Sequence, residues 1–148
     1  MHQQETQTTR SKTPEALAAQ GKCLIVEDSE FDSIKLSRVI AGCTKEMRIC
    51  VAATLKEARE ELAEGTTSLI LLDNNLPDGL GANFVQELAN DAALSQIPVI
   101  MVSDWPSPFM WEKASAAGVF YVLNKTEFDG RYVKSALKKG EKRRMRMN

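Results

Sequence analysis

The sequence contains little histidine, little cysteine and almost no net charge. Its one histidine, His2, lies in a polar stretch at the N-terminus. This argues against a Ser-His hydrolase, a zinc site built on histidines, and a histidine phosphotransfer module. Cys23, Cys43 and Cys50 show no C-x-x-C spacing, so we expect thiols packed as small apolar groups rather than a metal or redox site. A formal net charge of −1 gives the whole chain no bulk attraction to nucleic acid or membranes.

Long hydrophobic runs are also absent from the 148 residues. No run approaches the roughly 20 apolar residues of a membrane span, and the N-terminus lacks the apolar core of a signal peptide. We therefore expect a cytoplasmic protein that does not contact the membrane. The composition, 43% hydrophobic and 26% charged, is typical of one globular domain with a sizeable core.

The two ends of the chain differ in composition from its middle. Residues 1–20 are rich in Gln, Thr and Ser, which predicts a disordered N-terminal arm; helix formers after a proline at residues 14–20 also fit a short helix. Residues 21–140 are the expected globular domain. Residues 141–148 are an expected basic tail, and because no recognition helix accompanies them, we expect them to be solvated rather than to bind DNA or acidic lipid.

In the middle, short apolar runs alternate with helical patterns five times. That order predicts an α/β fold with a doubly wound, five-stranded parallel sheet and helices on both faces. The run at residues 69–72 has four branched apolar side chains in a row, as in a strand buried on both faces. The expected strands are residues 23–26, 48–52, 69–72, 97–102 and 119–123.

Capping residues mark the starts of three of the expected helices: Ser29, Thr54 and Thr126. Their side-chain oxygens can accept from the free backbone N–H groups of a first turn. Thr54 is followed three residues later by Glu57, which completes a capping-box pattern. The helix after Ser29 has an approximate apolar face that consists of Phe31, Ile34, Val39 and Ile40.

Polar residues stand where four of the strands end. Glu27 and Asp28 follow the first strand, Asp73 the third, Ser103 the fourth and Lys125 the fifth. Right-handed crossovers bring the carboxyl ends of parallel strands to one edge of the sheet, where open α/β folds bind ligands. Taken singly, Asp73 could simply begin a loop, Ser103 could be a cap and Lys125 a surface lysine. Their joint occurrence at successive strand ends favours a site.

Three carboxylates at one edge need a partner of opposite charge. A pair about 4 Å apart repels by on the order of 4 kcal/mol at an effective dielectric of about 20, so a cation or a shared proton must accompany the cluster. Oxygen ligands without a nearby Cys or His suit a hard ion, Mg²⁺ above all. An aspartate beside Mg²⁺, a lysine and a hydroxyl is a suitable nucleophile toward phosphorus.

The motifs around these residues resemble the receiver domain of two-component response regulators. They are Val-Glu-Asp ending at Asp28, Leu-Leu-Asp-Asn-Asn-Leu-Pro-Asp-Gly-Leu-Gly around Asp73, Val-Ser ending at Ser103, and residues 118–125. The resemblance covers about residues 22–139. It implies the flavodoxin-like receiver fold, with strand order 2-1-3-4-5.

The resemblance also implies a role for each residue of the site. Asp73 is then the phosphoacceptor, Asp28 and Asp73 ligate Mg²⁺, Glu27 acts on the ion mainly through water, and the backbone carbonyl of Asn75 completes the protein ligands. Two further residues are expected to contact the phosphoryl group: Ser103 and Lys125.

The implied function is a phosphoacceptor switch of a two-component phosphorelay. Its phosphoryl group would come from a histidine kinase or a histidine phosphotransfer protein, and its output would be protein binding, including formation of a homodimer. We expect no sequence-specific DNA binding, and no enzymatic activity beyond its own phosphorylation and dephosphorylation. Three alternatives stay open: a pseudo-receiver adaptor that works unphosphorylated, a phosphate sink, and an aspartate-nucleophile phosphatase, whose second acid is replaced here by Asn75.

Two residues near the fifth strand depart from the family pattern. Thr126 stands where the family usually has a proline behind a cis peptide bond, so we expect a trans bond and a differently shaped loop. Val122 stands three residues before the lysine, where the family usually has an aromatic residue. The neighbouring Tyr121 should point to the opposite face of the sheet. In the family, a shift of the hydroxyl residue, here Ser103, is coupled to the rotamer of that aromatic residue. We do not expect this coupling in its usual form here.

Two more departures follow the fourth strand. Asp104 replaces a small residue, and its carboxylate would either repel a phosphodonor or point away to cap the next turn. Trp105 borders the expected path of the hydrolytic water. We expect its bulk, together with Asn75, to slow the loss of phosphate.

Overall fold

Five parallel strands form the central sheet of the structure, a computed structural model that describes residues 21–147. Their order, β2-β1-β3-β6-β7, is 2-1-3-4-5 when the five sheet strands are counted along the chain. The predicted fold class and strand order are thus confirmed. The predictions for residues 1–20, a disordered arm and a short helix, lie outside the described residues.

The described elements follow one another in the predicted alternation, with a small hairpin, β4–β5, in addition. The sheet strands are β1 (Lys22–Val26), β2 (Arg48–Ala52), β3 (Thr67–Leu72), β6 (Val99–Ser103) and β7 (Tyr121–Asn124). The hairpin pairs β4 (Asn75–Leu76) with β5 (Gly79–Leu80). The helices are α3 (Glu30–Cys43), α4 (Leu55–Leu62), α5 (Gly81–Ala89), the 3₁₀ turn η1 (Leu94–Gln96), α6 (Pro108–Ala116) and α7 (Gly130–Met147).

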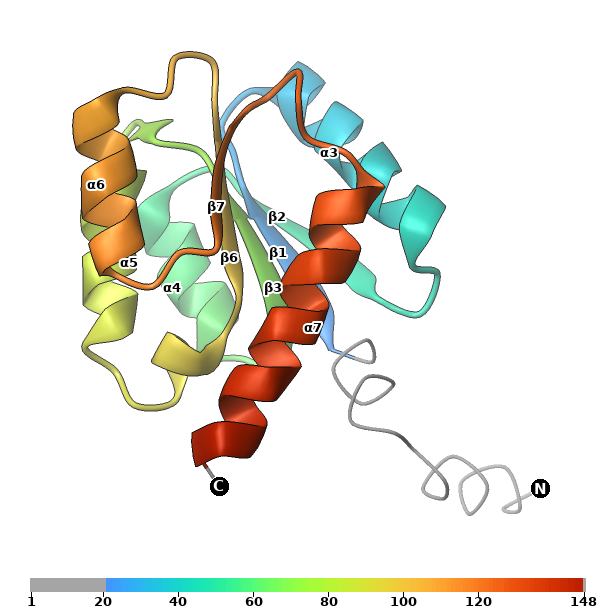
Figure 1. Ribbon diagram of the computed structural model, residues 1–148. Coiled ribbons are helices and arrows are strands. Elements are labelled where there is room, and N and C mark those ends of the chain that lie inside the picture. Colours follow the sequence, from blue (N-terminus) through green and yellow to red (C-terminus); the bar gives the residue numbers. More distant parts are fainter. Residues whose placement is uncertain (1–20, 148) are drawn as a thin grey trace.

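Helices cover both faces of the sheet, so its central strands are buried. Helices α3 and α7 lie on one face and α4, α5 and α6 on the other (Figure 1). Side chains alternate between these layers: Cys23 and Ile25 of β1 pack among residues of α3 and α7, whereas Leu24 and Val26 pack among those of α4, α5 and α6. Burial on both faces explains why the strands read as continuous apolar runs.

Two of the predicted helix caps are confirmed. The hydroxyl oxygen of Ser29 accepts a hydrogen bond from the N–H of Asp32 at 3.2 Å. The hydroxyl oxygen of Thr54 accepts from the N–H of Glu57 at 3.0 Å, and the Glu57 carboxylate accepts in return from a backbone N–H next to Thr54, that of Ala53, at 2.9 Å. These bonds fix where α3 and α4 begin, and α3 begins directly after the strand end that carries Glu27 and Asp28.

The predicted cap at Thr126 is wrong. Helix α7 begins at Gly130, and the Thr126 backbone N–H and hydroxyl both donate to the side-chain oxygen of Asn124, at 2.9 and 2.8 Å. Asp129 accepts from the N–H of Arg131 instead, at 2.9 Å. The loop between β7 and α7 is therefore longer than predicted, which allows it to reach across toward α3 (Figure 1).

The apolar face predicted for α3 is also wrong in part. Phe31 is 71% exposed and Ile34 is 45% exposed, whereas Leu36, Ile40 and Ser33 are buried. Ser33 can take a buried position because its hydroxyl donates to a backbone carbonyl one turn earlier, which removes the cost of an unpaired polar group. The buried face is therefore rotated from the one that apolar side chains alone indicate.

Residues 141–147 form the last turns of α7 rather than a separate tail. The helix continues because it packs on the domain: Gly140 lies so close to Pro98 that an added Cβ would be 2.8 Å from the proline ring, and Arg143 donates to the carbonyl oxygen of Gly118 at 2.9 Å. Basic residues in the last turn also complement the helix dipole. Among residues 21–147, no helix combines the length and apolar character that crossing a bilayer requires.

Candidate functional site

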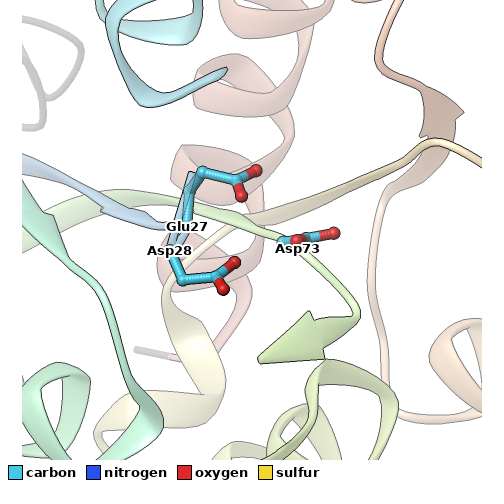
Figure 2. A group of neighbouring side chains, drawn as sticks. All are labelled: Glu27, Asp28 and Asp73. Carbon is cyan, nitrogen blue, oxygen red and sulfur yellow. The ribbon is translucent and has the colours of Figure 1, made fainter. Parts of the chain in front are cut away.

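The three acidic residues predicted to meet do lie together at the carboxyl edge of the sheet. Glu27 and Asp28 follow β1, and Asp73 follows β3, which is hydrogen-bonded to β1. The N–H of Asp73 donates to the carbonyl of Val26 at 3.0 Å, which extends the ladder to the site. Carboxylate oxygens of Glu27, Asp28 and Asp73 lie within 4.8 Å of one another, and Figure 2 shows the three side chains at the ends of their strands.

Lys125 brings its ammonium group into the same cluster. Its Nζ is 2.8 Å from Glu27 Oε1 and 3.8 Å from Asp73 Oδ2. The backbone places it there because Ser103 pairs with Asn124 across β6 and β7, and the N–H of Lys125 donates to the Ser103 carbonyl at 3.0 Å. The side chain is 9% exposed. Lys125 is therefore not a surface lysine.

Ser103 reaches the same edge of the sheet on β6. It is 2% exposed, and its hydroxyl oxygen accepts a hydrogen bond from the backbone N–H of Trp105 at 3.2 Å. A hydroxyl that accepts one bond keeps its own proton to donate. Ser103 can therefore offer a hydrogen bond to an anionic group at this edge.

Burial changes the proton affinity of two of the carboxylates. Loss of water around Glu27 raises its pKa to about 7, although the Lys125 ammonium and the Ser29 N–H favour the charged form. Burial likewise raises the pKa of Asp73, against the opposing effects of Lys125 and of the Asn74 backbone N–H, which donates to Asp73 Oδ1 at 2.8 Å. For both carboxylates the loss of water therefore outweighs the favourable effects of Lys125 and of the backbone N–H groups.

Lys125 itself is held firmly in the charged form. Burial alone would lower the pKa of its ammonium, but hydrogen bonds to Asp32 and Glu27 and the charge of Asp73 raise the pKa above its usual value. A lysine that stays protonated is a permanent positive charge beside Asp73. It can neutralise an anion that arrives there.

The loop after Asp73 is fixed by bonds that the sequence did not reveal. The side-chain oxygen of Asn74 accepts from the N–H of Ala82 at the start of α5, at 2.9 Å. Asp78 accepts from the N–H groups of Leu55 and Lys56 at 2.8 and 3.0 Å, and so caps α4 from a distance. The loop thus ties the strand that carries Asp73 to two helices, which holds the carboxylate in place.

Two further acidic residues lie at the site. The sequence did not predict the contact of Asp32, and it left two orientations open for Asp104. Asp32, expected only in the first turn of a helix, accepts a hydrogen bond from Lys125 Nζ at 2.8 Å. No local sequence pattern around Asp32 predicts this contact, because it joins residues 93 positions apart. Asp104 turns toward the site, with Oδ2 at 3.9 Å from Lys125 Nζ. It does not cap α6, since Ser107 does so.

The peptide bond before Thr126 and the directions of the Tyr121 and Val122 side chains are as predicted. The Lys125–Thr126 peptide bond is trans, like every other peptide bond in the described part of the chain. Tyr121 and Val122 point to opposite layers: the Tyr121 hydroxyl lies 2.6 Å from that of Ser135 on α7, whereas Val122 packs with the α4, α5 and α6 layer. Tyr132 packs inward, its ring 5.1 Å from that of Tyr121.

The donor set at the edge fits a small, hard divalent cation. Glu27, Asp28 and Asp73 offer only carboxylate oxygens, the ligands that Mg²⁺ prefers, and Asp28 is exposed so that bound waters could remain. The three cysteines lie elsewhere, on β1, α3 and β2. Asn75 begins β4 two residues after Asp73, and the role of its carbonyl stays a prediction.

Comparisons with known proteins agree with this geometry. The family described as the response regulator receiver domain matches residues 23–137 of the chain. The response regulator protein PilR of Pseudomonas aeruginosa is 38% identical over 104 residues, which are 70% of this chain and 22% of PilR. This chain therefore spans about a fifth of the length of that relative.

Solved structures show the same fold. A CheY-like response regulator receiver domain protein from Methanospirillum hungatei superposes with a TM-score of 0.71 at 21% identity, over 82% of this chain and 97% of that one. The beryllofluoride-activated NtrC4 receiver domain dimer gives a TM-score of 0.68 at 26% identity, over 82% of this chain and 96% of that one.

The raised pKa of Glu27 makes stability depend on pH. Its folded-state pKa of about 7 lies above the ordinary value of 4.5, so its contribution to stability is full below about pH 4.5 and is lost as pH rises through about 7. We expect wild type to lose on the order of 2 kcal/mol of unfolding free energy relative to Glu27→Gln between pH 5 and pH 8. Urea unfolding in EDTA measures this difference. The difference in unfolding free energy between wild type and Glu30→Gln, an exposed change on the first turn of α3, should not vary with pH in this way. Equal pH profiles for the two variants would contradict the assignment.

Proposed function

This chain belongs to the response regulator receiver domain family, and from that premise we propose that it is a phosphoacceptor switch. Asp73 receives a phosphoryl group from a histidine kinase or a histidine phosphotransfer protein. The observation that supports this most strongly is the meeting of Asp73 with two further carboxylates and Lys125 at one sheet edge, which also carries the Ser103 hydroxyl.

Three residues of the site have a defined part in the transfer. With acetyl phosphate as donor, an Oδ atom of Asp73 attacks phosphorus, the bond from phosphorus to the acetyl oxygen breaks, and acetate leaves with that electron pair. Lys125 and Ser103 offer positive charge and a hydrogen bond to the phosphoryl oxygens. Later attack of water on phosphorus returns the free Asp73 carboxylate and inorganic phosphate.

Asp28 and Asp73 are the residues we assign as direct ligands of Mg²⁺, with Glu27 acting through water and the Asn75 carbonyl as a further ligand. When bound, Mg²⁺ supplies charge neutralisation between the carboxylates and the phosphoryl oxygens. The charge of a bound ion would oppose the effect of burial, which raises the pKa of Glu27 and of Asp73. This accounts for a cluster of acids that the fold alone would not favour.

The output in this proposal is protein binding rather than turnover of a substrate. Phosphorylation adds negative charge beside Ser103 and Lys125, which biases the loops after β6 and β7 and helix α6 between two arrangements. A partner, or a second copy of the chain, then binds the changed surface. The NtrC4 receiver domain, described as a dimer in its beryllofluoride-activated form, supports a homodimer as one such output. The cytoplasm, where kinases of this kind present their phosphoryl groups, is the proposed location.

The direct test is transfer of radiolabel from acetyl phosphate. We expect wild type to incorporate label in Mg²⁺, and Asp73→Ala to lose essentially all of it, because the substitution removes the carboxylate that attacks phosphorus. Glu30→Gln is the control: it removes an exposed carboxylate from the first turn of α3 and should retain labelling. EDTA should stop incorporation in every protein.

The outcomes also separate the alternatives. Absence of label on folded wild type in Mg²⁺ would favour the phosphorylation-independent adaptor and contradict the proposal. Steady release of phosphate from many donor molecules per protein, at rates typical of an enzyme rather than a switch, would favour the phosphatase.

Trp105 provides a second test, through the lifetime of the phosphoryl group. Its side chain is 86% exposed beside Ser103, and Trp105→Ala keeps the backbone N–H that bonds Ser103 Oγ while removing the bulk. We expect hydrolysis of phosphorylated Trp105→Ala to be at least about twofold faster, or about 0.4 kcal/mol in barrier, as measured by the decay of label. Trp111→Ala, an exposed tryptophan change on α6, should leave the half-life unchanged; no acceleration in Trp105→Ala would reject this role.

A further inference from the structure

One ammonium group is shared by more carboxylates than it can hold at hydrogen-bond distance. Lys125 Nζ lies 2.8 Å from both Glu27 Oε1 and Asp32 Oδ2, but 3.8 Å from Asp73 Oδ2. Both short contacts are thus to carboxylates other than that of the phosphoacceptor. We infer that Asp32 is a positioning residue that holds Lys125 in a resting place beside Asp73, from which the ammonium must be released when a phosphoryl group arrives.

Asp32 is itself held rigidly enough to act in this way. Its backbone N–H donates to Ser29 Oγ at 3.2 Å, and the Ser29 N–H donates to Glu27 Oε2 at 3.1 Å. Together with the two short contacts of Lys125, these bonds close a ring through Glu27, Ser29, Asp32 and Lys125. The first turn of α3 therefore fixes the Asp32 carboxylate relative to the site.

Asp32 holds the ammonium on the side of the site that opens to a groove. A groove of about 270 Å³ lies beside the site, and Asp32 and Lys125 both line it, with Leu36 and Val39 of α3 and Phe128 of the next loop. Asp32 is 23% exposed at this boundary, whereas Glu27 is 1% exposed in the interior. Asp32 thus pulls the ammonium toward the groove, and Glu27 keeps it near Asp73.

The inference rests on the proposed function, because it assigns Asp32 a part in the same transfer. A phosphoryl oxygen on Asp73 needs a hydrogen bond from Lys125, whose ammonium instead donates to Asp32 and forms a short ion pair with Glu27. Removing the Asp32 charge frees the hydrogen that is donated to Asp32. It should therefore ease both phosphorylation and the binding of a phosphoryl analogue.

The experiment compares beryllofluoride binding and labelling by acetyl phosphate in five proteins. They are wild type, Asp32→Asn, Asp32→Ser, Asp32→Glu and Glu30→Gln, all made in a Trp111→Phe background so that fluorescence reports Trp105 beside Ser103. Glu30→Gln removes the same charge from the same turn of α3, and Glu30 makes no contact with Lys125 among the ion pairs of residues 21–147. Urea unfolding checks that each protein is folded, and Asp32→Ser serves as a second neutral variant.

We expect Asp32→Asn to bind beryllofluoride about fivefold more tightly than Glu30→Gln, the equivalent of about 1 kcal/mol. The labelling rate at saturating acetyl phosphate should rise by a similar factor, because the released hydrogen acts on the transferring group rather than on donor binding. Asp32→Glu, which restores the charge, should return toward wild type.

Equal or weaker beryllofluoride binding in Asp32→Asn and Asp32→Ser than in Glu30→Gln would overturn the role of Asp32. If instead wild type and Glu30→Gln neither bind beryllofluoride nor accept label, the proposed function fails, and the inference fails with it. The two failures are thus distinguished by the behaviour of wild type alone.

Discussion

A network of ion pairs around one ammonium group is the interaction on which this site depends. Lys125 contacts the carboxylates of Glu27 and Asp32 at 2.8 Å and lies 3.8 Å from that of Asp73. Without this charge, two buried carboxylates about 4 Å apart would repel by on the order of 4 kcal/mol, a large part of the stability of a domain of this size. Burial nonetheless raises the pKa of Glu27, so the charge of Lys125 does not fully offset the loss of water around that carboxylate. A divalent cation is the natural remaining partner.

The parallel sheet explains why these residues meet. Each strand enters the edge from the same side, and the caps at Ser29 and Thr54 turn the chain into a helix within a few residues of the strand end. The polar side chains therefore have little freedom to leave the edge. Asp78 adds a cross-link between the Asp73 loop and α4. A rigid frame of this kind suits a site that must respond to a single added group.

The sequence predicts the strands and the residues at their ends, because buried runs and capping residues are local signals, whereas the strand order is implied by the resemblance to the receiver family. Asp32 and the face of α3 could not be predicted in the same way. The contact of Asp32 depends on a loop more than 90 residues away, and the buried Ser33 looks polar until its hydrogen bond is known. The continuation of α7 through basic residues likewise depends on Gly140 meeting Pro98, a contact that no local pattern contains.

The central claim is that Asp73 accepts a phosphoryl group within this charge network. A crystal structure of the protein grown with Mg²⁺ and beryllofluoride tests it most directly. The account predicts beryllofluoride bonded to an Oδ atom of Asp73, an ion held by Asp28 and Asp73, and Lys125 Nζ within hydrogen-bond distance of a fluorine. A well-ordered site with Asp73 unmodified and Lys125 still on Asp32, at concentrations that saturate other receiver domains, would contradict it.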